Sequence, residues 1–289
     1  MKLDGRRESS NVEDRRRMSG GTATGLGLGG VLIVGIITLL MGGDLGDVVQ
    51  NVSNSGGIGG QTTEMTREFT AEEEALAKFS RQILASTEDV WSAYFKAKGL
   101  GAYRNPTLVL YTDATATACG TGQAAMGPFY CSSDQKLYID LSFFSSMKKQ
   151  LGADGDFAYA YVIAHEVGHH VQNVLGILGQ AHQQMARMNK TDSNRMSVRI
   201  ELQADFFAGV WAHYEKASFG SLEKGDLEEA IRCASVIGDD YLQKKAQGYA
   251  VEESFTHGTA AQRMKWLKKG IDTGDIEQGD TFSLRDSQL

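Results

Sequence analysis

The stretch Tyr161–Asn173 has the sequence YVIAHEVGHHVQN, which places three histidines and a glutamate in an otherwise apolar run. On an α-helix, His165 and His169 lie one turn apart, so both imidazoles project from the same face. This spacing suits two nitrogen ligands on one zinc ion, with Glu166 beside them as a base that acts on water without being a ligand. His170 points away from this face of a regular helix, so we leave it out of the predicted site.

The residues around these histidines favour a buried helix over a surface helix that carries histidines by coincidence. The run is apolar on nearly every side, through Tyr161, Val162, Ile163, Ala164 and Val167. Imidazoles in such a helix need polar partners or a metal ion. Gly168 is unfavourable inside a helix, so it predicts the close approach of another backbone or of a ligand at this turn.

A catalytic zinc ion usually has three protein ligands and one open position. One known arrangement extends the motif with a glycine and a third histidine, but this chain has Gln172 and Leu175 at those places. That class of zinc site is therefore excluded, and the third ligand must come from another part of the chain.

The segment 199–211, RIELQADFFAGVW, carries Glu201 and Asp205 one helical turn apart among apolar residues. Two acids on a buried face need positive partners, and a zinc ion with its ligand histidine would supply them. We predict that Glu201 is the third zinc ligand and that Asp205 orients one ligand histidine, His165. The alternative is that both acids lie on the exposed edge of an amphipathic helix.

The pattern along the rest of the chain predicts a small sheet followed by helices. A helix is expected over 69–99, with Thr70 and Glu73 as its capping box. Two β-type runs follow, TLVLYT at 107–112 and QKLYIDLSFF at 135–144, the second alternating as in a half-buried strand. Helices are then expected at about 157–175 and 193–216, from 226 and from 259. This order indicates a mostly helical α+β fold whose small sheet includes antiparallel strands.

The N-terminal residues differ from the rest of the chain. Residues 1–23 are polar and rich in arginine, residues 24–43 carry no charge, and Asp44 and Asp47 follow. The uncharged run predicts a transmembrane helix, and the flanking charges predict a cytoplasmic tail at 1–23 and an exported remainder. A cleaved signal peptide and a buried core helix are the alternatives. Residues 44–67 are predicted to form a flexible linker, and residues 68–289 one globular domain.

The cysteines and the net charge bear on compartment and partners. In an exported domain, Cys119 and Cys131 are expected to form a disulfide, and a zinc pair is the alternative, although their spacing matches structural zinc sites poorly. Cys233 lies in a helical pattern and is expected to be buried. The formal net charge of -7 weighs against nucleic acid as a partner, because phosphate binding needs a basic face.

Several separated motifs together resemble the neutral zinc metallopeptidase family of bacterial membrane proteins. They are ACG at 118–120, GPFYC at 127–131, LYIDLSFF at 137–144, HEVGHHVQ at 165–172 and ELQADFFAGVWA at 201–212, after an apolar N-terminal segment. The resemblance covers essentially the whole chain. It implies a zincin-like fold with one zinc ion per chain and a glutamate as third ligand, as in thermolysin-like peptidases. In that pattern E-x-x-x-D follows H-E-x-x-H, which matches Glu201 and Asp205.

The expected function is that of a zinc metallopeptidase anchored in the bacterial inner membrane, with its catalytic domain in the periplasm. Glu166 is predicted to take a proton from the water that attacks a peptide carbonyl, and to pass it to the leaving amine. The strand at 135–144 is the expected edge along which an extended protein or peptide substrate binds.

His257 precedes a predicted helix and is a candidate hydrogen-bond donor to the oxyanion that forms during peptide hydrolysis. A surface histidine in a loop is the alternative, and Tyr241 and Tyr249 are other candidates for the donor. The resemblance to zincins implies that Arg263 accompanies His257 as a structural partner.

Two other functions are compatible with these residues. A catalytically weak zincin could serve as a binding or scaffold module at the membrane, although Glu166 is intact. Metal-dependent hydrolysis of a non-peptide bond is also possible, since no residue excludes it. His182 and His213 have no spacing that matches a metal site, and both are expected to be structural or exposed.

Overall fold

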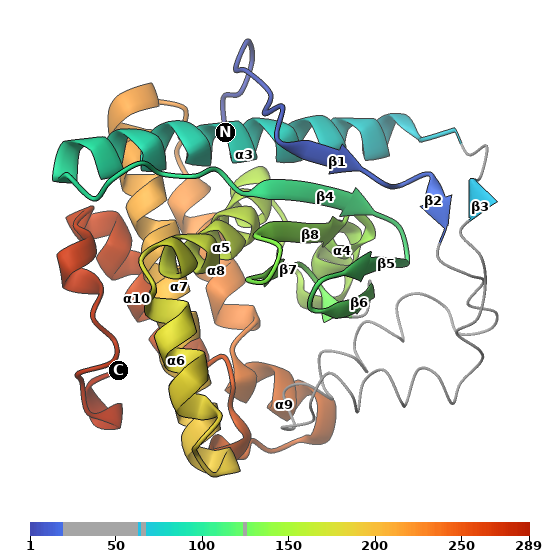
Figure 1. The fold of residues 1–289 in the computed structure, drawn as a ribbon. Helices are drawn as coiled ribbons and strands as arrows, with labels where there is room; N and C mark the ends of the chain where they lie inside the picture. Colours follow the sequence, from blue (N-terminus) through green and yellow to red (C-terminus); the bar gives the residue numbers. More distant parts are fainter. Residues whose placement is uncertain (20–62, 65–67, 124–125) are drawn as a thin grey trace.

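The computed structural model describes residues 1–19, 63–64, 68–123 and 126–289, and Figure 1 shows their arrangement. The strands are β1 (Val12–Asp14), β2 (Met18–Ser19), β3 (Thr63–Glu64), β4 (Thr107–Tyr111), β5 (Ala114–Thr117), β6 (Gly120–Gln123), β7 (Phe129–Cys131) and β8 (Lys136–Asp140). The α-helices are α3 (Ala71–Lys98), α4 (Ser142–Ser146), α5 (Asp156–Val174), α6 (Ile177–Met185), α7 (Lys190–Tyr214), α8 (Asp226–Val236), α9 (Asp239–Gln247) and α10 (Ala260–Thr273). Short π- and 3-10 helices are η2 (Met147–Leu151), η3 (Glu215–Phe219), η4 (Glu252–Ser254), η5 (Ile276–Gly279) and η6 (Asp286–Gln288). The fold is α+β, as predicted, with most strands preceding most helices.

The central sheet has four strands in the order β1-β4-β8-β7. β1 and β8 both pair parallel with β4, whereas β7 pairs antiparallel with β8. β4 and β8 coincide with the two predicted β-type runs. β8 is buried on both faces rather than on one, because Leu137 and Ile139 enter the main core while Tyr138 packs against a second cluster with Val109 and Tyr111.

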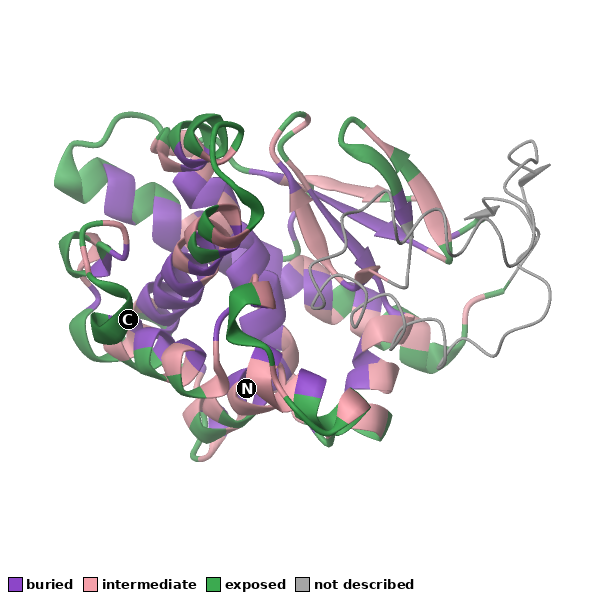
Figure 2. Cartoon of the chain, turned by 90° about the horizontal axis from the view of Figure 1, so that it is seen from below, coloured by how far each residue is buried: buried purple, intermediate pink, exposed green. Residues whose placement is uncertain are grey.

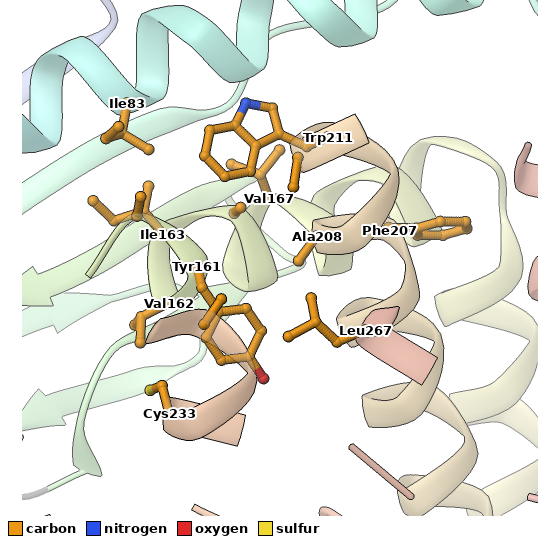
Figure 3. Close-up of a cluster of buried hydrophobic side chains, with 14 of the residues drawn as sticks. Ile83, Tyr161, Val162, Ile163, Val167, Phe207, Ala208, Trp211, Cys233 and Leu267 are labelled. Carbon is orange, nitrogen blue, oxygen red and sulfur yellow. The ribbon is translucent and has the colours of Figure 1, made fainter. Parts of the chain in front are cut away.

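Helix α5 lies at the centre of the helical part of the molecule and carries the histidine-rich motif. Figure 3 shows the side chains around it, which are Ile83 of α3, Phe207, Ala208 and Trp211 of α7, Cys233 of α8 and Leu267 of α10. Figure 2 shows buried residues concentrated along the same packed helices. Each large apolar side chain buried in this way contributes roughly 1.5–3 kcal/mol relative to an exposed one. The predicted buried helix is thus confirmed, and Cys233 is buried as expected.

Helices α5 and α7 cross closely at Gly168. A Cβ atom at this position would lie 2.7 Å from the carbonyl oxygen of Ala204. Only glycine therefore allows the backbones to approach this far, which confirms the close backbone contact predicted at Gly168. The crossing brings the side chains of one turn of α5 next to those of one turn of α7.

Helix α3 begins and ends at the residues that its sequence predicts. The side chain of Thr70 accepts a hydrogen bond from the Glu73 backbone, and the Glu73 carboxylate accepts one from the Thr70 backbone. The helix ends at Gly99, whose φ of 67° is in the left-handed region that favours glycine. Thr259 and Gln262 form the same capping box at the start of α10.

Residues 1–19 pack against the domain formed by the later part of the chain. β1 is an edge strand of the central sheet, beside β4 (Figure 1). The Arg6 guanidinium lies 2.9 Å from the buried carboxylate of Glu215, and Arg16 is itself buried. β2 and β3 then pair antiparallel, with Met18 opposite Glu64. Ser19 and Thr63, the described residues on either side of the gap, therefore lie next to each other.

The structure corrects the predicted membrane topology. The proposed transmembrane segment at 24–43 and nearly all of the linker at 44–67 lie outside the described residues, and in the part of the chain that is described no helix is long and apolar enough to cross a membrane. The long helices α3 and α7 carry charged residues, and α5 is enclosed by the core. A single crossing between residues 19 and 63 would also separate β1 from β4, yet these strands are paired. The single-pass arrangement with a cytoplasmic N-terminus and a periplasmic domain is therefore wrong, and the described residues contain no transmembrane helix of the kind that the predicted fold class includes.

Candidate metal centre and active-site cleft

Two helices bring the three predicted metal ligands together. α5 carries His165 and His169 on one face, and α7 carries Glu201 where it crosses that face. One nitrogen or oxygen atom of each residue lies within 4.8 Å of the others. The Nε2 atom of His165 is 3.1 Å from one carboxylate oxygen of Glu201, and the Nε2 atom of His169 is 3.4 Å from the other.

The other ring nitrogen of each histidine contacts a hydrogen-bond acceptor. His165 Nδ1 lies 2.8 Å from Asp205 Oδ1, and His169 Nδ1 lies 2.9 Å from Gln172 Oε1. The orientation of the Gln172 amide is fixed because its Nε2 donates to the carbonyl oxygen of Ile200 at 2.8 Å. Both Nδ1 atoms therefore donate a proton, which leaves Nε2 as the atom of each ring that faces Glu201 and that can bind a metal once it is unprotonated.

The acidic groups around His165 favour a positive charge at this point, whether a proton on the ring or a metal ion. Burial disfavours the charged form of His165, but Asp205 and Glu201 outweigh it and raise its pKa to about 10. Burial also acts to raise the pKa of Glu201, yet the imidazoles of His169 and His165 bring it well below its usual range. The three groups thus concentrate attraction for a cation at one point. Two imidazole nitrogens and one carboxylate oxygen are a donor set that fits zinc.

Asp205 is fully buried and is held by more than the histidine. It accepts hydrogen bonds from the guanidinium of Arg263 at 2.8 and 2.9 Å and from the hydroxyl of Tyr161 at 2.5 Å. Burial acts to raise the pKa of Asp205, but Arg263 and His165 lower it to about 2. Asp205 therefore remains ionised and can fix the ring of His165. Arg263, expected beside His257, pairs instead with Asp205. The role of Tyr161 was not predicted, because nothing in its local sequence marks it as a polar partner of Asp205.

Glu166 lines the cleft next to the three ligands and is 7% exposed. Among the residues that the structure describes, none forms a hydrogen bond with its carboxylate. Burial raises the pKa of Glu166, against the opposing effect of His165 and His169. A buried carboxylate with raised proton affinity and no competing partner is suited to accept a proton from water.

His257 lines the same cleft and lies just before α10. Its Nδ1 lies 3.3 Å from Asp239, whose other carboxylate oxygen accepts hydrogen bonds from the backbone N–H groups of Thr256, His257 and Gly258. Burial acts to lower the pKa of His257, but Asp239 outweighs it and raises the pKa. This contact directs Nε2 away from Asp239. Neither Tyr241 nor Tyr249 is among the described residues that line the cleft.

The cleft has a volume of about 660 Å³ and extends from the hairpin of β5 and β6 to α6 and α9. β8 is not its edge strand, because β4 and β7 flank β8 on both sides. The edge position belongs to β7, whose residues Phe129 and Tyr130 line the cleft. The edge predicted at 135–144 is thus one strand away from the edge that the structure shows.

The predicted disulfide is present. Cys119 and Cys131 are bonded, with a Cα–Cα distance of 5.8 Å. The bond joins the β5–β6 hairpin to the end of β7, and both segments form one wall of the cleft. The disulfide therefore constrains the cleft wall rather than the helices that carry the metal ligands.

His170 lies outside the metal centre, as predicted, and its role is structural. The ring is fully buried, its Nε2 lies 2.6 Å from the carbonyl oxygen of Arg104, and its Nδ1 lies 3.0 Å from the hydroxyl of Tyr130. Burial lowers the pKa of His170 to about 4, so the neutral ring donates to Arg104 and accepts from Tyr130. This pair connects β7 to the turn of α5 that carries His169.

The two remaining histidines also lie outside the ligand cluster. His182 is exposed on α6 and lines the cleft. His213 Nδ1 lies 2.8 Å from the carbonyl oxygen of Ile271 and joins α7 to α10.

Comparison with known proteins identifies the family. The family model described as "Putative neutral zinc metallopeptidase" matches residues 1–282. YpfJ of Escherichia coli strain K12 is 49% identical over 289 residues, which cover 98% of this chain and 99% of that protein. Rv2575 of Mycobacterium tuberculosis strain H37Rv is 40% identical over 211 residues, which cover 70% of this chain and 69% of that protein. No solved structure matches the chain. The chain belongs to the neutral zinc metallopeptidase family.

Proposed function

We propose that this protein hydrolyses peptide bonds with one zinc ion held by His165, His169 and Glu201. The observation that carries the proposal is the pair of fixed imidazoles. Asp205 and Gln172 accept from the Nδ1 atoms, so both Nε2 atoms and the Glu201 carboxylate point at one place. A proton held between these groups can be replaced by zinc, for which two imidazole nitrogens and one carboxylate oxygen are a suitable donor set.

Zinc, when bound there, supplies a Lewis acid that polarises a carbonyl and makes water more acidic. Glu166 then acts as the general base, because its carboxylate lines the cleft beside the ligands with no other partner in the described part of the chain. It accepts the proton from the attacking water and delivers it to the leaving nitrogen. The nitrogen can then leave as a neutral amine rather than as an amide anion.

His257 supplies a hydrogen bond to the oxyanion through Nε2, since Asp239 holds Nδ1. One such donor is worth roughly 3 kcal/mol in the transition state. Asp239 is a positioning residue for His257, in the way that Asp205 is for His165. It did not stand out in the sequence, because its partners are backbone groups of a loop that follows it.

The test combines zinc analysis with cleavage of a peptide library by the wild-type chain, Glu166→Gln and Glu228→Gln, the last an exposed control on α8. We expect one zinc ion in all three proteins, and kcat/KM at least 100-fold lower only in Glu166→Gln, because a general base contributes about 100- to 10,000-fold. Zinc without cleavage by the wild type would favour a binding or scaffold role. Absence of zinc from the wild type would refute the metal site.

A further inference from the structure

We propose that the cleft selects an extended peptide with apolar, uncharged side chains on both sides of the bond to be cleaved. This inference rests on the proposed peptidase function and adds the substrate class. It follows from how the lining residues are distributed along α5 and from where the charges of the cleft are already engaged.

One apolar surface lies on the N-terminal side of the metal ligands. Val162 precedes His165 by three residues, which is about 4.5 Å along the helix axis. Phe143 of α4 also lines the cleft, and its neighbour Phe144 stacks on Tyr159, one turn before Val162 on α5. Phe143 is only partly buried by the protein itself, so its uncovered face is available to a substrate side chain.

A second apolar surface lies on the C-terminal side. Leu178 and Met185 belong to α6, which follows the end of α5, and Ile200 is adjacent to Glu201 on α7. All three line the cleft, and Leu178 and Ile200 pack together in a small cluster with Met185 at its border. The metal ligands therefore lie between two apolar surfaces, as a scissile bond lies between two side chains.

The charged groups of the cleft are committed to the catalytic site. Among the described residues that line the cleft, the formally charged side chains are Glu166, Glu201 and Arg263. Glu201 faces the imidazoles, and Arg263 pairs with Asp205. A charged substrate side chain on either apolar surface would thus lose its hydration without gaining an opposite charge, which disfavours its binding.

The sheet edge explains why side chains decide the selection. β7 has β8 on one side and, among the described residues, no strand on the other. An extended peptide added there would bind through its main chain, which is the same for every sequence. Discrimination then falls to the apolar surfaces on either side of the metal ligands.

The experiment uses the full chain with internally quenched peptides that differ only at the two residues flanking the cleaved bond. One peptide carries leucine at both positions, and its partners carry lysine or glutamate at one of them. We expect kcat/KM at least 100-fold lower for each charged peptide. Binding of the same peptides to Glu166→Gln, measured by fluorescence anisotropy, should weaken at least tenfold for the charged ones.

Met185→Lys tests the second surface, because Met185 lines the cleft and lysine retains helix propensity. We expect this variant to favour the glutamate peptide at least tenfold more than the wild type does. Met188→Lys is the matched control, since Met188 is 36% exposed and is not among the lining residues described. The control should keep the wild-type preference.

The outcomes separate this inference from the proposed function. If the wild type cleaves charged and apolar peptides within threefold of one another, the inference fails and the peptidase function stands. If no peptide is cleaved but Glu166→Gln binds the apolar peptide preferentially, the inferred selectivity stands and the peptidase function fails. Equal binding of all peptides without cleavage would overturn both.

Discussion

Helix α7 and the turn that follows it carry two glutamates with different surroundings. Glu201 lies in the middle of α7, and Glu215 is the residue at which α7 passes into η3. The carboxylate of Glu215 accepts hydrogen bonds from the guanidinium of Arg6 and from the hydroxyls of Ser86 and Ser221. The carboxylate of Glu201 faces the Nε2 atoms of His165 and His169, at 3.1 and 3.4 Å.

This difference separates a carboxylate that stabilises the fold from one that serves a site. Every oxygen of Glu215 has a donor that belongs to the chain, so its burial is compensated by the protein alone. Among the described residues Glu201 has only the two imidazoles as hydrogen-bond partners, and a metal ion can replace the proton that they share with it. The identity of the partners therefore distinguishes the two roles.

The largest expected effect comes from Glu201→Gln. The neutral amide removes the charge that holds the cation, so we expect loss of stoichiometric zinc and a decrease in kcat/KM of about 1,000-fold or more. The free energy of unfolding without metal should fall, because the imidazoles that lower the pKa of Glu201 in the folded chain lose their charged partner. Metal analysis, peptide cleavage and urea denaturation measure the three quantities. Full zinc occupancy in this variant would remove Glu201 from the ligand set.

Glu215→Ala should have the opposite profile. It leaves Arg6 without its partner and two buried hydroxyls without an acceptor, so we expect the free energy of unfolding to fall by about 3–5 kcal/mol. The folded fraction should still bind one zinc ion. Urea denaturation provides the measurement, with the exposed Glu228→Ala as control. A loss below about 1 kcal/mol would show that the two glutamates do not differ in the way described.

Gln172→Leu sharpens the comparison at the metal centre. The substitution removes the acceptor for His169 Nδ1 and frees the tautomer of that ring. Loss of such an outer partner typically weakens metal binding by about 10- to 100-fold. Competition with a chelator of known zinc affinity measures the change, and Gln172→Glu, which keeps an acceptor, is the control. Equal zinc affinity in Gln172→Leu and the wild type would contradict the assigned tautomer.

Ser221→Ala is the smallest test. It removes one of the three donors to Glu215 and should lower the free energy of unfolding by about 1 kcal/mol, the usual contribution of one hydrogen bond. Zinc affinity should not change, because the hydroxyl is part of the structural cluster alone. A change in zinc affinity without a change in stability would show that Ser221 affects the metal site. The Glu215 cluster and the metal site would then not be independent.

Local patterns were sufficient to predict the centre of this molecule. The histidine spacing, the apolar flanks and the acids at Glu201 and Asp205 all lie within single helices, so the sequence specifies which side chains share a face. Gly168 also carried its own signal, because glycine is unfavourable in a helix unless space requires it. The close crossing with α7 supplies that requirement.

The features that escaped prediction depend on partners distant in the chain. Gln172 and Tyr161 are ordinary helix residues until Ile200 and Arg263 are placed beside them. β1 has only three residues, too few to show an alternating hydrophobic pattern. Its parallel partner β4 lies about a hundred positions further along the chain. The prediction of the membrane topology failed for a related reason. An apolar run and its flanking charges do not reveal that the segments before and after the run pair with each other.

The pairing of β2 with β3 makes residues 20–62 removable in principle. Ser19 lies opposite Thr63 in an antiparallel ladder, so their Cα atoms are about 5 Å apart and a tight turn of two to four residues can span them. A shortened chain joined at this point would keep β1, the sheet and the cleft in one continuous polypeptide. A deletion of residues 20–62 would therefore test what this segment contributes to activity, while β1 stays covalently connected to the rest of the chain.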